Sequence, residues 1–307
     1  MDNFMDKVGF IGYGNMGKMV IKNILKFNIF DGSEMIVSNR TITKLDKLKE
    51  DYPSITITDD NKYLAKNSNK IFIFVETHQF KKLISEISSF INKNTHIIHV
   101  CAGLSFDNII NVYEGSVSQV IPSIASTFNE NTFNKKCEKS NFGKLGVSLI
   151  LHNKNTQNND KEFVEEIFNE FSYIEIIDDI DGNKNSKNSN NSLEIATILA
   201  SCGPAFISLI IDNLTDIAIL KSENNIDANK TKEIIIKTIL GTLIQINTNN
   251  LSTYEIITKT ATKKGITEIG LNYLDENFDE FSKNLFDILL KRYGEVKQDL
   301  ANEYSKS

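Results

Sequence analysis

The stretch Val8-Gly-Phe-Ile-Gly-Tyr-Gly-Asn-Met-Gly17 decides the fold of this chain. Its first four residues have the apolar pattern of a short strand, and residues 18–27 continue as a helix with an apolar inner face. Between strand and helix, Gly12, Gly14 and Gly17 have the spacing G-x-G-x-x-G. This order of strand, glycine turn and helix predicts that backbone N–H groups of the turn bind the phosphates of a dinucleotide.

Each glycine of the turn has its own expected role. Gly12 lets the chain turn sharply off the strand, Gly14 leaves no side chain between backbone and pyrophosphate, and Gly17 lets the helix lie close to the sheet. Asn15 and Met16 complete the turn before the predicted helix, whose N-terminal dipole favours anions, and we expect them to contact the cofactor. A glycine-rich turn without a ligand is the alternative.

The end of the second predicted strand bears on the choice of cofactor. Residues 35–37 are apolar, and Ser38, Asn39, Arg40 and Thr41 follow. An NAD-binding unit places an Asp or Glu here to hold the ribose 2′-hydroxyl, and none stands in this loop. Hydroxyls, an amide and a guanidinium suit a 2′-phosphate instead, so the sequence predicts NADPH, with NADH as the alternative. The alternative for Arg40 is a solvated surface charge.

Strands and helices alternate through the first half of the chain. Residues 70–75 and 96–101 are apolar on both faces, as central parallel strands must be. The alternation predicts an α/β fold with a Rossmann-like, doubly wound parallel sheet. Ligands of such sheets gather at the carboxyl ends of the strands, so Val75, Ala102 and Gly103 should border the same crevice as the glycine turn.

A polar, low-complexity stretch at residues 178–191 separates two parts of the chain. No strand pattern follows it, and residues 205–222 are apolar nearly all round, which predicts burial by another subunit. We therefore expect an NAD(P)-binding, Rossmann-like domain at residues 1–180 and an all-helical dimerisation and substrate domain at 192–307. The expected assembly is a homodimer through the helical domain, with a larger oligomer as the alternative.

Composition limits the partners of this chain of 307 residues. Its net charge of −6 argues against nucleic acid, and by eye no apolar run reaches the length of a membrane span. Cys101, Cys137 and Cys202 lack C-x-x-C spacing and indicate free thiols in a reducing compartment, so we expect a cytoplasmic protein with a small-molecule substrate. The four histidines have no spacing typical of a metal site, and no metal is expected.

Four motifs together resemble the pyrroline-5-carboxylate reductase family. They are G-F-I-G-x-G-N-M in the glycine turn, S-N-R-T at residues 38–41, C-A-G at residues 101–103 and C-G-P-A-F at residues 202–206. They follow the family's order at roughly its spacing, over nearly the whole chain. The resemblance implies a Rossmann domain followed by a helical domain that interlocks with a partner subunit. It also implies reduction of the cyclic imine 1-pyrroline-5-carboxylate to L-proline with NAD(P)H, the last step of proline synthesis.

The resemblance extends to the family's substrate loop, S-P-G-G-x-T, which matches residues 262–267. It implies that Thr267 is the catalytic residue and hydrogen-bonds the imine nitrogen, and that the backbone near Gly265 holds the substrate carboxylate. The implied substrate site is Thr262, Gly265, Ile266 and Thr267. Because Thr267 precedes Glu268 at a predicted helix start, a capping role is its alternative.

Several segments depart from the family pattern, among them the substrate loop and the segment at the nicotinamide pocket. The proline and first glycine of the substrate loop are Lys263 and Lys264, and the family's M-P-N-T-P at the nicotinamide pocket ends here in Ser123, Ile124 and Ala125. These changes keep two other functions open. One is a related reductase acting on another imine, a ketone or a deazaflavin cofactor, and the other is a nucleotide-binding paralogue without turnover.

Overall fold

The structure is a computed structural model that describes residues 7–126, 144–177 and 191–305. The chain divides into two compact units. The first holds the described residues of Met1–Asn129, Lys144–Ser201 and Lys291–Ser307, and the second holds Cys202–Leu290. The predicted linker at 178–191 lies, but for its last residue, outside the described residues.

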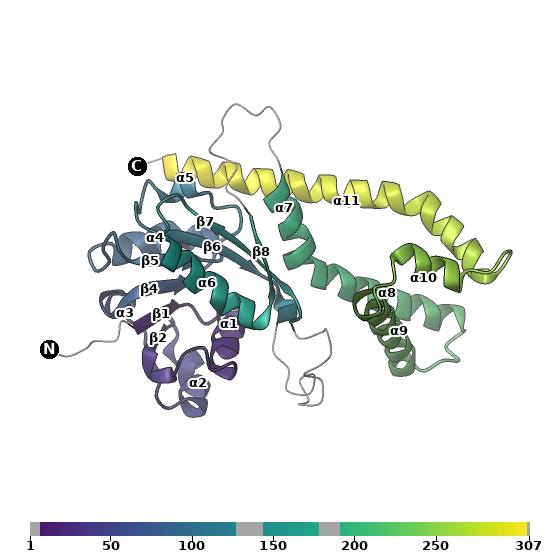
Figure 1. Ribbon diagram of the computed structural model, residues 1–307, viewed down its shortest axis with the longest axis horizontal. Coiled ribbons are helices and arrows are strands. Elements are labelled where there is room, and N and C mark those ends of the chain that lie inside the picture. The colour runs from purple at the N-terminus through teal and green to yellow at the C-terminus, as the bar shows by residue number, and fades with distance from the viewer. Residues whose placement is uncertain (1–6, 127–143, 178–190, 306–307) are drawn as a thin grey trace. The chain divides into compact units, whose positions relative to one another are not determined.

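One eight-stranded sheet forms the centre of the first unit (Figure 1), in the order β3-β2-β1-β4-β5-β6-β7-β8. The strands are β1 (Lys7–Ile11), β2 (Met35–Ser38), β3 (Thr56–Thr58), β4 (Ser68–Ile73), β5 (His96–His99), β6 (Val117–Pro122), β7 (Val147–His152) and β8 (Tyr173–Ile176). The predicted α/β, Rossmann-like fold is confirmed. The sheet is not wholly parallel, however, because β7 runs antiparallel to β6. Such a strand is common toward the edge of doubly wound sheets, and an apolar pattern does not encode strand direction.

Helices cover both faces of this sheet. They are α1 (Asn15–Lys26), α2 (Asp46–Asp51), α3 (Asn61–Lys66), α4 (Thr77–Ile87), α5 (Phe106–Ile109), α6 (Asn158–Phe171) and α7 (Ser192–Thr197), with short 3-10 helices at Gly32–Glu34, Ile42–Leu45 and Ile124–Ser126. Apolar side chains of α1 and α6 form one core with the sheet, and those of α3 and α4 form a second core on the other face. Phe10 of β1 and Phe72 of β4 stack in the first core with ring centroids 5.0 Å apart.

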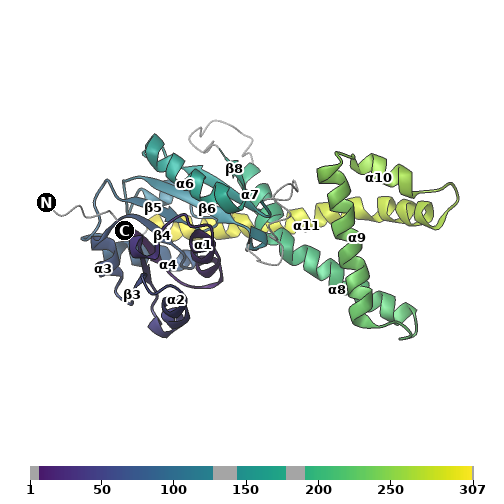
Figure 2. The same cartoon turned by 60° about the horizontal axis from the view of Figure 1, so that its bottom comes forward.

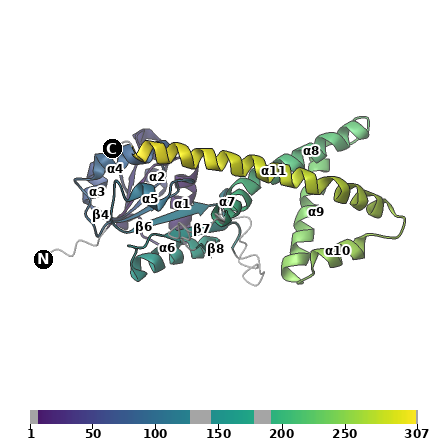
Figure 3. The same cartoon turned by 90° about the horizontal axis from the view of Figure 1, so that it is seen from above.

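The last turns of α11 (Ile266–Ser305) complete the second core (Figure 3). Leu300 and Tyr304 are buried there, and the Lys81 ammonium of α4 donates to the Glu303 carbonyl at 2.8 Å. These contacts join Lys291–Ser307 to the sheet unit. The first unit thus also contains Ser192–Ser201, and it includes both ends of the range 192–307 that the sequence assigns to the helical domain.

The second unit is helical (Figure 2). It consists of α8 (Gly203–Lys221), α9 (Ala228–Thr248), α10 (Thr253–Thr260) and the first part of α11, and a π-helical turn at Ile198–Cys202 precedes it. In the single chain Leu209 and Leu220 of α8 are 69% and 65% exposed, and Ile234 of α9 is 67% exposed. Such apolar surface is typical of a subunit interface.

One helical run, Ser192–Lys221, is long and apolar enough to cross a membrane by length and composition. The expectation that no run reaches that length was therefore wrong. Interface helices of dimeric proteins have the same composition, since they too are buried on most sides in the assembly.

Two histidines on β5 make the stability of the sheet unit depend on pH. His96 and His99 are fully buried, and burial lowers the pKa of each from 6.5 to about 3. His96 bonds Ser118 at 2.8 Å, and the Nδ1 of His99 accepts from the Cys101 N–H at 3.2 Å. Below about pH 6.5 the unfolded chain therefore binds protons that the folded chain excludes.

We expect the free energy of unfolding to fall as the pH is lowered from about 6.5 toward 4.5, by up to about 1.4 kcal/mol per pH unit for each buried histidine. Urea unfolding at stepped pH measures this slope. Stability that stays level over this range would contradict the assignment.

Candidate functional site

The glycine turn lies where the strand order reverses, between β1 and β4. The Gly12 N–H donates to the Ser38 carbonyl at the end of β2, and the Phe74 N–H after β4 donates to the Ile11 carbonyl of β1, both at 2.8 Å. The ends of three strands thus meet at one edge of the sheet. This is the position at which doubly wound sheets bind their ligands.

The three glycines of the turn have different surroundings. Gly12 has a φ of +101°, and a Cβ there would meet the Phe74 carbonyl oxygen. A Cβ on Gly17 would collide with the Gly12 carbonyl, so α1 packs directly on the turn. Gly14 has an extended backbone with φ −76°, and a Cβ there would meet nothing within 4 Å. The backbone at Gly14 therefore faces open space, as close approach of a pyrophosphate requires.

The loop after β2 is attached to the glycine turn. Ser38 is buried, and its hydroxyl donates to an amide oxygen on α3 at 2.7 Å. Asn39 accepts from the Tyr13 N–H at 3.1 Å and donates to the Thr41 carbonyl at 2.8 Å. Arg40 and Thr41 are exposed, and within residues 7–126, 144–177 and 191–305 the Arg40 guanidinium has no hydrogen-bond or ion-pair partner. Ser38 and Asn39 therefore shape the loop, and Arg40 is available to an anion.

The residues that follow β4 and β5 lie side by side at the same edge. The Cys101 thiol is 3.6 Å from the Val75 carbonyl oxygen, and the Thr77 hydroxyl donates to the Ala102 carbonyl at 3.5 Å. Burial raises the pKa of Cys101 to about 12, so this thiol is not a nucleophile at neutral pH. Val75 and Ala102 thus adjoin each other, as predicted for residues that border one crevice.

Sequence reasoning missed the side chains that hold this loop in place. Gln119 of β6 donates to the Cys101 carbonyl at 2.6 Å, and the Gly103 N–H donates to the Tyr293 hydroxyl of α11 at 3.1 Å. The spacing of Tyr293, Val296, Leu300 and Tyr304 is a helical stripe that the sequence does contain. It could have indicated that the end of the chain packs on another element, but not on which one.

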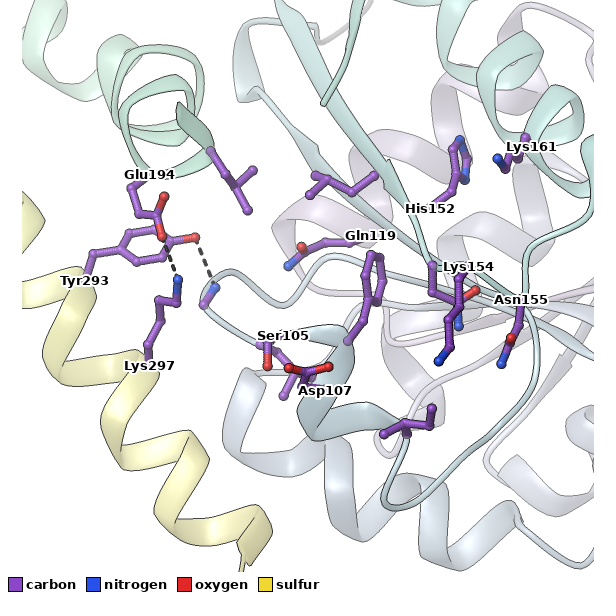
Figure 4. A pocket seen from close by; sticks show the side chains of 17 residues that line it. Ser105, Asp107, Gln119, His152, Lys154, Asn155, Lys161, Glu194, Tyr293 and Lys297 are labelled. Carbon is purple, nitrogen blue, oxygen red and sulfur yellow. Dashed lines mark hydrogen bonds and ion pairs between the residues drawn. The ribbon is translucent and has the colours of Figure 1, made fainter. Parts of the chain in front are cut away.

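A cavity of about 630 Å³ lies on the face of the first unit that carries Gln119 (Figure 4). Tyr293 and Lys297 line one side of it, and Lys154 and Lys161 lie across from them. Gly103 also lines the cavity. No residue of the glycine turn or of the loop after β2 lines this cavity. The cavity therefore shares only Gly103 with the residues predicted to border the dinucleotide crevice.

The predicted substrate loop belongs to the helical unit and forms a tight turn before α11. The Gly265 N–H donates to the Thr262 carbonyl at 2.8 Å, and a Cβ on Gly265 would collide with the Thr262 hydroxyl. Lys264 has a φ of +61°, the left-handed region that favours glycine. Lys264 thus has the left-handed backbone conformation that the glycine at this position of the motif S-P-G-G-x-T adopts without strain.

Thr267 lies in the first turn of α11, although the sequence predicts a loop through this residue and a helix from Glu268. It is half-buried, and its hydroxyl has no hydrogen-bond partner among the residues that the structure describes. The turn is capped instead by Glu268, whose carboxylate accepts from the Lys264 N–H at 2.6 Å. Thr267 therefore does not cap the helix. Ile266 beside it is 92% exposed.

Two protein families match separate parts of the chain. Residues 7–103 match the family described as NADP oxidoreductase coenzyme F420-dependent, and residues 190–295 match pyrroline-5-carboxylate reductase dimerisation. The first match covers the glycine turn and the loops after β2, β4 and β5. The second covers the helices with exposed apolar side chains and supports formation of a homodimer through them.

Relatives that match most of the chain are named pyrroline-5-carboxylate reductases. The chain is 36% identical over 269 residues to the pyrroline-5-carboxylate reductase of Methanobrevibacter smithii, covering 88% of this chain and 97% of that protein. It is 27% identical to pyrroline-5-carboxylate reductase 3 of Bacillus subtilis, covering 94% of this chain and 96% of the relative.

The fold is also that of a solved structure. The Plasmodium falciparum pyrroline carboxylate reductase with NADP bound has a TM-score of 0.75 to this chain at 20% identity, covering 95% of this chain and 98% of the other. The match to the M. smithii protein over most of both chains agrees with the Rossmann-like sheet and the dimerisation helices, and the chain therefore belongs to the pyrroline-5-carboxylate reductase family.

Proposed function

We propose that this protein reduces 1-pyrroline-5-carboxylate to L-proline with NADPH, as a cytoplasmic homodimer. The observation that carries the proposal is the glycine turn at the reversal of strand order, with open space beside Gly14. The names of the whole-chain relatives support the substrate, and the NADP bound to the P. falciparum protein supports the cofactor.

The residues present fit a phosphorylated dinucleotide. Asn15 and Met16 are the first two residues of α1, so their N–H groups have no acceptor within the helix, and the N-cap residue Gly14 offers no side-chain acceptor. These N–H groups can therefore donate to the pyrophosphate. Arg40 and Thr41 would hold the 2′-phosphate, with Ser38 and Asn39 shaping their loop. Val75, Ala102 and Gly103 would border the nicotinamide half. When bound, NADPH would supply the hydride that adds to the carbon of the CH=N bond and makes it CH2.

The substrate loop would hold the other reactant. The backbone around Gly265 binds the substrate carboxylate, with Thr262 and Ile266 on either side, and the Thr267 hydroxyl bonds the ring nitrogen. One proton completes the secondary amine, and it comes from this hydroxyl, from solvent or from an imine that is already protonated. Since a protonated imine is strongly electrophilic, the main task of the protein is to hold the two reactants together and exclude water.

Steady-state turnover tests the proposal. Purified protein given NADPH and 1-pyrroline-5-carboxylate should consume the cofactor and release proline in equal amounts. A protein that binds NADPH but leaves this imine and related cyclic imines unchanged would contradict the proposal.

Replacing Arg40 by Ala should weaken NADPH binding about 10-fold and leave NADH binding nearly unchanged, because only NADPH carries the 2′-phosphate. Fluorescence titration of both cofactors measures this. Lys93 is an exposed cation before β5, and Lys93→Ala is the control for the change in net charge. Equal NADPH affinity in the Arg40 variant and the wild type would show that Arg40 is only a surface charge.

A second candidate function keeps the cofactor and changes the substrate. Lys263 and Lys264 put two exposed cations on the substrate loop, and Lys264 holds a left-handed backbone that is costly for a side chain. Such a loop suits an imine with more negative charge than 1-pyrroline-5-carboxylate. Comparing kcat/KM for a cyclic imine monocarboxylate and a dicarboxylate separates the two functions, and a preference for the dicarboxylate favours the second.

A further inference from the structure

The loop after β5 is held by side chains from four different elements. The Cys101 N–H donates to His99 of β5, and the Cys101 carbonyl accepts from Gln119 of β6. The Ala102 carbonyl accepts from Thr77 of α4, and the Gly103 N–H donates to the hydroxyl of Tyr293. Tyr293 lies on α11, 190 residues from Gly103 in the sequence. A backbone with so many side-chain contacts is held in one conformation.

The contact with α11 is close as well as polar (Figure 4). Gly103 has a φ of +79°, and a Cβ on it would lie 3.1 Å from Val296, one turn after Tyr293 on the same helix. Beside it the Lys297 ammonium pairs with the Glu194 carboxylate of α7 at 2.8 Å. The last part of α11 is therefore attached to the loop by a hydrogen bond, by packing and by a neighbouring ion pair.

We infer that Tyr293 is a positioning residue for the cofactor, which acts by holding the Gly103 backbone in the shape that accepts the nicotinamide half of NADPH. This inference rests on the proposed function, because it uses the assignment of Ala102 and Gly103 to the cofactor crevice. It goes beyond that function by giving Tyr293, near the end of the region that matches the dimerisation family, a role in cofactor binding.

The state of the phenol suits this role. The pKa of Tyr293 is raised, mainly by burial and next by the negative charge of Glu194. The hydroxyl therefore keeps its proton at neutral pH. A neutral phenol oxygen accepts the Gly103 N–H while its own proton stays available to another acceptor. Without this oxygen the buried N–H of Gly103 loses its partner, and the loop gains other conformations.

The test is the substitution Tyr293→Phe in the full-length protein, which keeps the ring and removes the hydroxyl. We expect the Kd for NADPH to rise roughly 3- to 10-fold, as the loss of one buried hydrogen bond predicts. In turnover, KM for NADPH should rise by a similar factor, while kcat and KM for the imine stay within about twofold, since the contact acts on cofactor binding.

Tyr304→Phe is the matched control. Tyr304 lies on the same helix, is buried against the same sheet, and its hydroxyl has no hydrogen-bond partner among the described residues. Its substitution should leave NADPH affinity unchanged, and both variants should keep the dimer.

The outcomes separate the inference from the function. If the wild type binds NADPH and Tyr293→Phe binds it equally well, the inference is wrong and the function stands. If both Phe variants weaken binding equally, or if Tyr293→Phe does not fold, Tyr293 has only a structural role and the inference is again wrong. If the wild type does not bind NADPH, the proposed function fails and this inference with it.

Discussion

Replacing Gly14 by Val should abolish most NADPH binding and leave the fold intact. The backbone of Gly14 is extended, a conformation that valine adopts readily, and its side chain would enter space that no protein atom fills. That space is where we expect the pyrophosphate, so the valine would displace it from the N–H groups of α1. We expect the Kd for NADPH to rise at least about 100-fold, which corresponds to about 2.7 kcal/mol.

Gly17→Ala provides the contrast within the same turn. A Cβ on Gly17 collides with the Gly12 carbonyl and lies close to Phe74, so this change should lower the free energy of unfolding by about 1–3 kcal/mol. Titration calorimetry and urea unfolding of both variants measure the two effects. If the Gly14→Val variant does not fold, or if it binds NADPH as tightly as the wild type does, the proposed role of Gly14 is wrong.

Replacing Thr267 by Ala should reduce kcat about 100-fold while the Kd for NADPH stays within about twofold. The Thr267 hydroxyl is not used by the helix, since Glu268 caps the first turn of α11. A hydrogen bond to the ring nitrogen that strengthens as the amine forms would act on the chemical step and not on cofactor binding.

Thr267→Ser is the control, because it keeps the hydroxyl and should retain most of the activity. Single-turnover measurements of NADPH oxidation separate the chemical step from product release. Equal activity of the Ala variant and the wild type, or an equal loss in the Ser and Ala variants, would remove Thr267 from the mechanism.

The part of the fold that follows from local pattern could be predicted. The spacing of Gly12, Gly14 and Gly17 encodes a backbone shape, and strands that are apolar on both faces can only be buried. The direction of β7 could not be predicted, because direction depends on which neighbour a strand pairs with and leaves no mark on its own apolar pattern.

The candidate site divides in the same way. The position of Arg40 at the carboxyl end of β2 could be predicted, because a loop that directly follows a strand must lie at that edge of the sheet. Tyr293 could not, since its contact with Gly103 joins residues far apart in the chain through the packing of α11. The start of this helix was predicted at Glu268, two residues too late, because Gly265 and the preceding lysines have the composition of a loop, while the helix already begins at Ile266.

Titration of the wild-type protein with NADPH tests the central claim most directly, because every proposed step needs phosphates bound at the start of α1. We expect one NADPH molecule to bind per chain, more tightly than NADH. A protein that is folded and dimeric yet binds no nicotinamide dinucleotide would contradict it.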